Sequence, residues 1–122
     1  MSYDNPKSVI YDLQSTLPDV GWQDLQLTGS IVHHANLDYG CARYCRINGI
    51  VYVNIMVDFV PASATIATLP VGFRPSQQLL VKGFTSPYNH TRVDIHPSGV
   101  ITAHTPSTTS WTAITESFPV DA

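Results

Sequence analysis

Apolar and polar residues alternate along much of the chain with the two-residue period of a β-strand. The longest example is 49–59, GIVYVNIMVDF, whose apolar face consists of Val51, Val53, Ile55, Val57 and Phe59. Shorter segments between turn residues predict further strands at 23–27, 65–69, 77–84, 90–96, 99–105 and 110–118. Many short strands separated by frequent turns are typical of antiparallel proteins. The expected fold class is therefore all-β, a compact antiparallel β-sandwich or barrel.

The dipeptide Asn48-Gly49 predicts a tight hairpin, because a type I′ turn requires positive φ at both central residues. With a two-residue loop, Arg46 faces Val51 and Tyr44 faces Val53, whereas a longer, bulged loop would exchange the two faces. The face opposite the core is then also rich in apolar residues, although one face of an antiparallel sheet usually meets water. A second layer or another subunit would cover this face, and we favour the subunit. The residues expected at this oligomer interface are Cys41, Cys45, Ile50, Tyr52 and Met56.

Residues 1–20 follow a helical pattern instead. An Asn-Pro dipeptide suits the start of a helix, and Ile10, Leu13 and Leu17 then form an apolar stripe that ends at Pro18. A helix this short needs a surface to pack on. We therefore expect either a short helical stem, which contributes this stripe to an oligomer, or a linker. The β head domain is expected to occupy 21–122.

The composition narrows the range of partners. A chain of 122 residues is long enough for one domain with its own core. Charged residues make up only 12% of the chain, about half the usual share, and the net charge is −3. This balance argues against nucleic acid and favours neutral polar ligands or partner subunits. No run approaches the ~20 apolar residues of a membrane span, and no signal peptide is evident, so we expect synthesis in a cytosol and no membrane insertion.

The cysteines and histidines do not predict a metal site. Cys41 and Cys45 would lie roughly 13 Å apart at ~3.3 Å per strand residue, too far for a disulfide, so we expect free thiols. His96 and His104 flank a Pro-Ser-Gly turn and are too far apart along the ladder to share one ion, although a three-fold axis could gather one histidine from each of three copies. We expect no metal and no cofactor. The sequence contains neither a nucleophile elbow nor a glycine-rich phosphate loop, so we expect no enzyme.

The segment 90–105 carries the most suggestive side chains. If Gly99 occupies a left-handed position in the turn, the outward face of a hairpin carries Arg92, Asp94, His96 and His104, while Val93 and its apolar neighbours point inward. Planar polar groups beside an aromatic ring are suited to neutral sugars. The candidate carbohydrate-binding residues are Arg92, Asp94, His96, His104, Trp111 and Tyr88. The alternative is a solvated polar face with a tryptophan in the core; Trp22 is interpreted as a core or interface residue.

The segment 65–83 predicts a strand, a rigid turn and a second strand. Pro70 and Pro75 restrict φ on either side of the turn, and Gly72 supplies backbone freedom between them. Phe73 is expected to pack under the turn. Arg74 is expected to donate to carbonyl groups there or to a neighbouring protomer, because its guanidinium presents a fixed fork of donors.

Five motifs follow one another along the chain: GWQDLQL, YCRINGIVYVNI, ATLPVGFRPS, DIHPSGVIT and WTAITESFPVD. Their order resembles the C-terminal head domain of tail-tip and baseplate receptor-binding proteins from phages of Gram-positive bacteria. The resemblance covers about 21–121, and its most specific part is the LPVGFRPS segment at 69–76. Cys45 stands where a basic residue is common in that family.

The resemblance implies a compact antiparallel head, usually a homotrimer, that binds saccharide on the host cell wall. The motifs mark the scaffold, so no binding residue is carried over from the family. We accordingly expect a non-catalytic phage receptor-binding head, made in the host cytoplasm and located in the virion at the tail tip or baseplate. It would bind host cell-surface polysaccharide multivalently and contact other tail or baseplate proteins. The alternatives are a purely structural baseplate component that docks other virion subunits and, less favoured, a glycan-cleaving enzyme.

Overall fold

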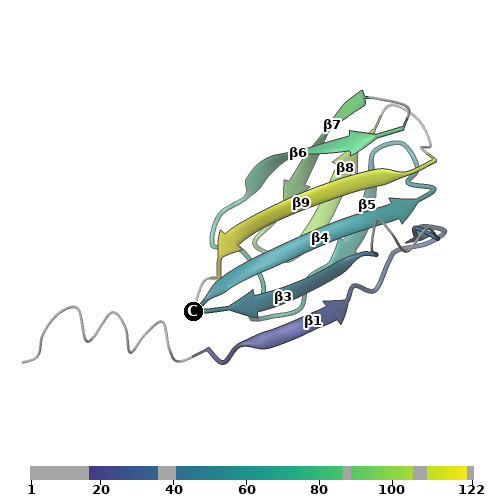
Figure 1. Cartoon of the computed structure of the whole chain (residues 1–122). Coiled ribbons are helices and arrows are strands. Elements are labelled where there is room, and N and C mark those ends of the chain that lie inside the picture. The colour runs from purple at the N-terminus through teal and green to yellow at the C-terminus, as the bar shows by residue number, and fades with distance from the viewer. Residues whose placement is uncertain (1–16, 36–40, 87–88, 106–109, 121–122) are drawn as a thin grey trace, which may run out of the picture.

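The computed structural model describes residues 17–35, 41–86, 89–105 and 110–120, and in this part the chain is all-β (Figure 1). The strands are β1 (Val20–Asp24), β2 (Val32–His33), β3 (Arg43–Ile47), β4 (Ile50–Asp58), β5 (Ala64–Thr68), β6 (Leu79–Thr85), β7 (Asn89–Ile95), β8 (Val100–His104) and β9 (Thr112–Pro119). All of their pairings are antiparallel. The predicted fold class is confirmed. Within the described ranges, no helix is long and apolar enough to cross a membrane.

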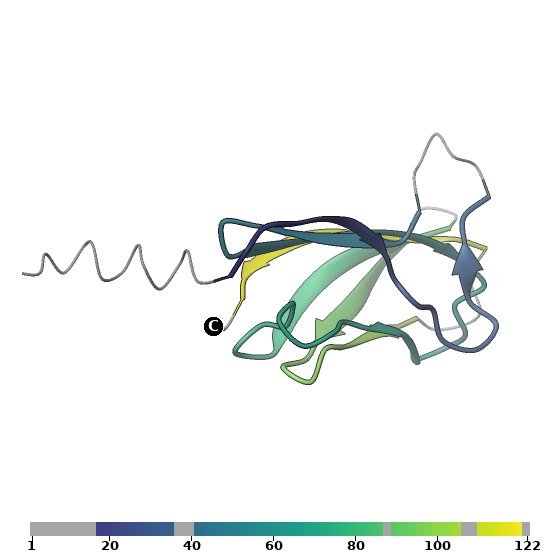
Figure 2. The same cartoon turned by 90° about the horizontal axis from the view of Figure 1, so that it is seen from below.

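The strands form one sheet that curls into a half-barrel. Their order is β1-β3-β4-β9-β6-β7-β8-β5, with β2 paired to β4 beyond the end of β3. Figure 2 shows β1, β3, β4 and β9 as one layer and the green strands of the second half as the facing layer. The two ends of the sheet meet, because Leu27 forms a bridge with Ala67 and the Thr28 amide donates to the Ile66 carbonyl at 2.9 Å. The expected sandwich or barrel is therefore a curled sheet whose ends are joined by one short contact.

The predicted hairpin is confirmed in both turn and register. Asn48 and Gly49 have φ values of 53° and 76°, and Arg46 pairs with Val51. The predicted core face of β4 is buried as far as Val57. Phe59 was predicted on that face, and this prediction is wrong: β4 ends at Asp58, and Phe59 is 53% exposed with a φ of 65°. The positive φ interrupts the two-residue alternation, so the next residue is the one that enters the core.

The facing layer supplies the other half of the core. As predicted, Gly99 has a positive φ, of 90°, in the β7–β8 turn. This turn brings Val93 opposite Ala103 and Ile95 opposite Ile101, and all four side chains are fully buried. The apolar residues predicted to point inward therefore form the core beneath the outward face of β7 and β8.

The turn between β5 and β6 is held by its own side chains. Arg74 Nε donates to the Leu69 carbonyl at 2.8 Å, and the Phe73 amide donates to the Pro70 carbonyl at 3.1 Å. The Phe73 ring meets the Tyr44 ring edge-on, with centroids 4.9 Å apart. Arg74 thus stabilises the turn within the same chain, which is one of the two roles expected for it.

The predicted interface residues differ in how much surface they offer. Both cysteines are free thiols, as expected, but Cys41 precedes β3 rather than lying on it. Cys45 and Met56 are already buried within the chain, at 1% and 9% exposure, and burial raises the pKa of the Cys45 thiol. Ile50 is half-buried, whereas Tyr52 is 39% exposed. Their role between protomers stays a prediction.

The predicted N-terminal stem falls largely outside the described residues, and this includes Ile10 and Leu13. Leu17 is described, is half-buried, and precedes β1 without belonging to a helix. Pro18, the predicted end of the stem, is held by its carbonyl, which accepts from Arg46 Nε at 3.1 Å and from Arg46 Nη2 at 2.9 Å. The N-terminal segment is therefore anchored to β3 at the point where it enters the sheet.

Candidate functional site

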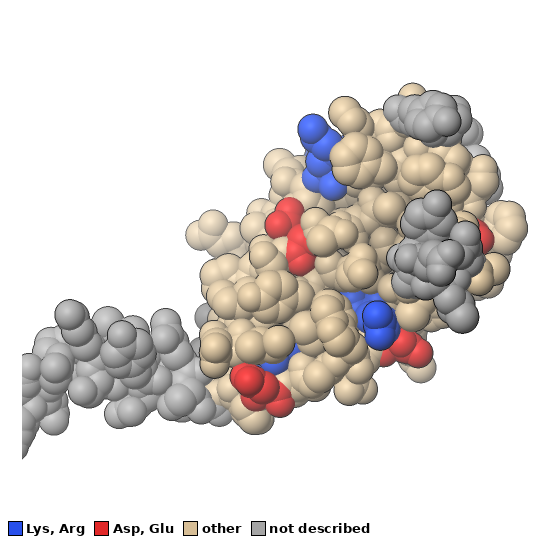
Figure 3. All heavy atoms as spheres, viewed as in Figure 1, with Lys and Arg blue, Asp and Glu red and all other residues tan. Residues whose placement is uncertain are grey.

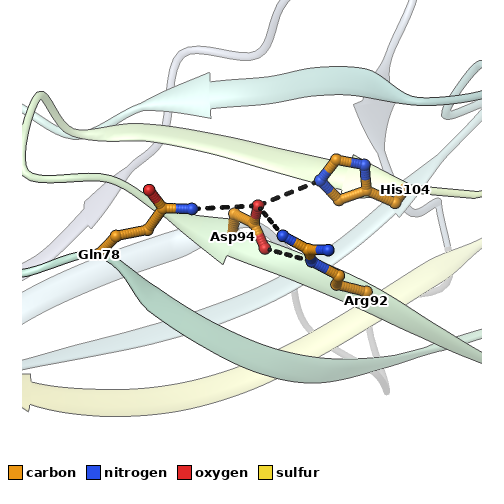
Figure 4. Close-up of polar contacts among 4 residues, drawn as sticks. All are labelled: Gln78, Arg92, Asp94 and His104. Carbon is orange, nitrogen blue, oxygen red and sulfur yellow. Dashed lines mark hydrogen bonds and ion pairs between the residues drawn. The ribbon is translucent and has the colours of Figure 1, made fainter.

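Three of the predicted site residues meet on the outward face of β7 and β8 (Figure 4). Arg92 is paired with His104 across the two strands, and Asp94 lies two residues further along β7 on the same face. Arg92 donates to Asp94 through Nε (2.9 Å) and Nη2 (3.0 Å), and His104 Nε2 lies 3.2 Å from Asp94 Oδ2. Gln78, which the sequence did not single out, donates to the same oxygen at 3.3 Å.

The carboxylate at the centre of this cluster is already satisfied by the protein. Asp94 is only 4% exposed, and both of its oxygens accept from neighbouring side chains. Hydrogen bonding from Arg92 lowers the pKa of Asp94 below its ordinary value of 3.8, against the opposing effect of burial, and His104 adds to the lowering. The cluster therefore holds Asp94 ionised and joins β7 to β8. Arg92, His104 and Gln78 keep exposed surface for a ligand, whereas Asp94 does not.

The Asp94 cluster predicts an acid-dependent contribution to stability. Because the pKa of Asp94 is lower in the folded than in the unfolded protein, its contribution is present above about pH 4 and is lost as the pH falls through the folded-state pKa. Asp94→Asn should therefore unfold at a lower urea concentration than wild type at pH 7, and this difference should narrow towards pH 2–3. Parallel urea titrations across that range test it; a difference that stays constant with pH would contradict it.

The other predicted site residues lie apart from this cluster. The described hydrogen bonds of His96 are made by its main chain, whose amide donates to Val100 and whose carbonyl accepts from Gly99. Tyr88 lies outside the described residues. Trp111 precedes β9 and lines a different surface. The predicted combination of an aromatic platform with the Asp94 cluster is therefore not assembled by the described residues.

Trp111 instead lines a hollow of about 500 Å³ on the outer face of β4, β9 and β6. The register places Met56, Ala113 and Phe84 side by side across these three strands. Phe84 is 49% exposed, and its ring meets His90 edge-on at 5.1 Å. The lining side chains are aromatic, apolar, amide, hydroxyl and imidazole groups, among them Trp111, Phe84, Met56, His34, Asn54 and Thr115.

One end of this hollow carries an imidazole held by an aspartate. His34 Nδ1 lies 2.7 Å from Asp58 Oδ1, and both side chains are largely buried. The His34 amide donates to the Met56 carbonyl at 3.0 Å, which fixes the chain after β2 against β4. The imidazole therefore has a defined position beside the aromatic residues of the hollow.

A second hollow, of about 420 Å³, lies further along the same face. Trp22 and Tyr52 line it with exposed rings, together with the polar residues Asn54, Thr115, Glu116 and Ser117. The Arg43 guanidinium lies 5.4 Å from the centre of the Trp22 ring. Trp22 was expected in the core or at an interface; it is 48% exposed on β1, so a core position is wrong.

This outer face carries few charged groups. In Figure 3, most of its surface is neither acidic nor basic, and the charged side chains are scattered rather than gathered. Sequence reasoning did not connect Tyr52, Asn54 and Phe84 with Trp111, because their strands meet only in the folded sheet. The available signal was that Tyr52 and Asn54, two alternate positions of β4 opposite the core, are aromatic and polar. No group of three or more histidine, cysteine or acidic side chains among the described residues could hold a metal ion.

The LPVGFRPS segment, which carries the most specific part of the resemblance to phage heads, lies away from both hollows. Its residues form the turn stabilised by Arg74, and none of them lines either hollow. It therefore marks the scaffold and carries no information about a ligand. No protein-family model matches this chain, and no curated protein sequence matches it.

Proposed function

We propose that this chain is the head domain of a phage receptor-binding protein, and that it binds neutral polysaccharide on the host cell surface without cleaving it. The observation that carries the proposal is the hollow beside Trp111, where the half-buried Trp111 ring and the exposed Phe84 ring lie next to amide and hydroxyl groups on a nearly uncharged face. The resemblance of the sequence motifs to phage heads supports the same function.

The chemistry of the hollow suits a sugar. Aromatic rings offer flat apolar surfaces to the C–H face of a pyranose, and Trp111 and Phe84 provide two of them. Asn54 can both donate to and accept from sugar hydroxyls, and so can Thr115. The carboxylate at the centre of the Asp94 cluster is already satisfied by neighbouring side chains. We therefore place the saccharide at Trp111 rather than at Asp94.

The assembly in this proposal is a homotrimer at the tail tip or baseplate, in contact with other tail proteins. A single shallow site binds a sugar weakly. Three sites on one trimer, and many trimers on one virion, raise the overall affinity through effective concentration. In this arrangement the outer face of β4 and β9 is open to saccharide, so Tyr52 and Met56 would face the ligand and not another protomer, in contrast to the interface expected from the sequence. The protomers would then meet through other surfaces, including the N-terminal segment.

Trp111→Ala should lower the affinity for cell-wall polysaccharide by about tenfold, which corresponds to ~1.4 kcal/mol. Removing the ring deletes one flat surface of the hollow while leaving its polar groups in place. The measurement is binding of the full chain to intact Gram-positive cells of a strain panel, followed by titration with polysaccharide purified from any strain that is bound. Leu80→Ala is the matched control, because Leu80 is an apolar side chain, 65% exposed, that lines neither hollow.

Three results would each overturn part of the proposal. Unchanged affinity of a Trp111→Ala variant that melts at the wild-type temperature would exclude this hollow as the site. Failure of the wild-type chain to bind any strain, combined with binding to another virion protein, would favour the purely structural baseplate role. Release of reducing ends from the polysaccharide would show that the chain is an enzyme.

A further inference from the structure

We infer that the two hollows form a single groove that binds a linear, uncharged saccharide chain lengthwise along β4 and β9. This inference rests on the proposed function and goes beyond it, because it specifies a polymer of several units rather than one terminal sugar. The site proposed above occupies one end of the groove, and Trp22 and Tyr52 lie at the other.

The first step is that the hollows are continuous. Asn54 and Thr115 line both of them, and these residues face each other across β4 and β9. Thr115 Oγ1 donates to Asn54 Oδ1 at 3.4 Å, and within the described ranges the side-chain nitrogen of Asn54, Nδ2, has no hydrogen-bond partner. An amide donor without a partner therefore lies where the two hollows join. A sugar hydroxyl passing from one hollow to the other would accept its hydrogen bond.

The second step is the length of the groove. Tyr52 lies four residues before Met56 on β4, Met56 pairs with Ala113 on β9, and Trp111 lies two residues before Ala113. Six residue steps at ~3.3 Å each separate the Tyr52 level from the Trp111 level by roughly 20 Å. A single sugar ring cannot contact both ends, whereas an extended oligosaccharide can.

The third step is that each end carries aromatic rings suited to stacking. Trp22 and Tyr52 are 48% and 39% exposed, and the Arg43 guanidinium packs 5.4 Å from the Trp22 ring centre, which favours a defined position of that ring. At the opposite end, Phe84 is 49% exposed beside Trp111. Stacking surfaces at both ends and hydrogen-bonding groups between them match a polymer whose rings and hydroxyls recur along its length.

The fourth step concerns charge. Glu116 is the only acidic or basic residue, histidine aside, among the described residues that line the two hollows. A polymer with a phosphate or carboxylate in each repeat would meet this carboxylate without a compensating lysine or arginine in the lining. The groove therefore favours an uncharged chain, and binding should depend little on salt concentration.

The test compares fragments of different length. Polysaccharide from a strain that the wild-type chain binds is partially hydrolysed and separated into fragments from single repeats to long chains, and each is titrated against the full-length protein. Wild-type affinity should rise with length. Trp22→Ala should bind the shortest fragments within about twofold of wild type but lose about tenfold for the long ones. Trp111→Ala should lose affinity for fragments of every length. Val71→Ala is the control, because Val71 is 81% exposed and lines neither hollow, and it should bind every fragment like wild type.

The outcomes separate the two claims. If Trp22→Ala binds every length like wild type while Trp111→Ala does not, the lengthwise groove is wrong and the saccharide site at Trp111 stands. If the bound polymer is anionic and its binding weakens steeply between 50 and 500 mM NaCl, the preference for an uncharged chain is wrong. If neither tryptophan affects any fragment, the proposed site itself fails, and the groove with it.

Discussion

Replacing Gly99 by alanine should destabilise the protein by about 3 kcal/mol, a large share of the ~5–15 kcal/mol that keeps a typical domain folded. Gly99 has a φ of 90°, where an L-residue is strained, and its added Cβ would lie 2.3 Å from the Leu69 carbonyl oxygen and 2.6 Å from Arg74 Nε. These are the two atoms that join in the Arg74–Leu69 hydrogen bond. The methyl group would therefore displace the bond that holds the turn between β5 and β6. Urea unfolding at pH 7 measures the loss.

Gly49→Ala is the matched control for this substitution. Gly49 also has a positive φ, of 76°, but nothing lies within 4 Å of its added Cβ. The Gly49→Ala variant should lose only about 1 kcal/mol of folding stability, from backbone strain alone. Equal losses at the two glycines would mean that the contact between Gly99 and the Arg74 turn contributes nothing to stability.

Arg46→Ala should cost about 3 kcal/mol, because one buried guanidinium holds two separate parts of the chain, at Pro18 and at Gly72–Phe73, against β3. Arg46 is 6% exposed and donates twice to the Pro18 carbonyl and, through Nη1, once to the Gly72 carbonyl at 2.7 Å. Its guanidinium also lies 4.6 Å from the centre of the Phe73 ring. Removing it leaves these carbonyls without their charged donor and uncovers the ring. Arg46→Lys should lose less stability than Arg46→Ala, because the lysine ammonium keeps the positive charge but not the planar fork of donors.

The control is the other arginine of β3. Arg43 lies on the outer face, its Nε has no hydrogen-bond partner among the described residues, and its described contact is with the Trp22 ring. Arg43→Ala should therefore cost only about 0.5–1 kcal/mol in the same urea titration. A loss as large as that of Arg46→Ala would show that burial of the arginine stems, rather than the hydrogen bonds of Arg46, dominates.

Local patterns in the sequence predicted the fold class and the two hairpins around Asn48-Gly49 and Gly99. The Asn48-Gly49 turn predicted the register of its hairpin, and the alternation that follows it identified Val51, Val53, Ile55 and Val57 as core. The same reasoning placed Gly99 in a left-handed turn and aligned Arg92 with His104. Each of these depends on neighbours within about a dozen residues, where turn geometry decides the pairing.

The candidate site is formed by strands that are distant in the sequence, and local patterns do not predict which of these strands pair. β4 and β9 are adjacent in the sheet although more than fifty residues separate them in the chain, and only this pairing brings Trp111 towards Asn54. Trp22 was interpreted as a core or interface residue because tryptophan is large and apolar. Its exposure follows from its position on a strand at the end of the sheet, which has a partner on one side only in the described part of the chain.

The short contact between Leu27 and Ala67 has a consequence for solubility. An open sheet presents unpaired amide and carbonyl groups at its last strand, and other chains can add to them, which is a route to aggregation. Here the segment after β1 hydrogen-bonds to β5, so that edge is partly occupied by the protein itself. The opposite edge, β1, is interrupted by an irregular register between Val20 and Gln23. Two small local features thus protect a sheet that never closes completely from polymerising through its edges.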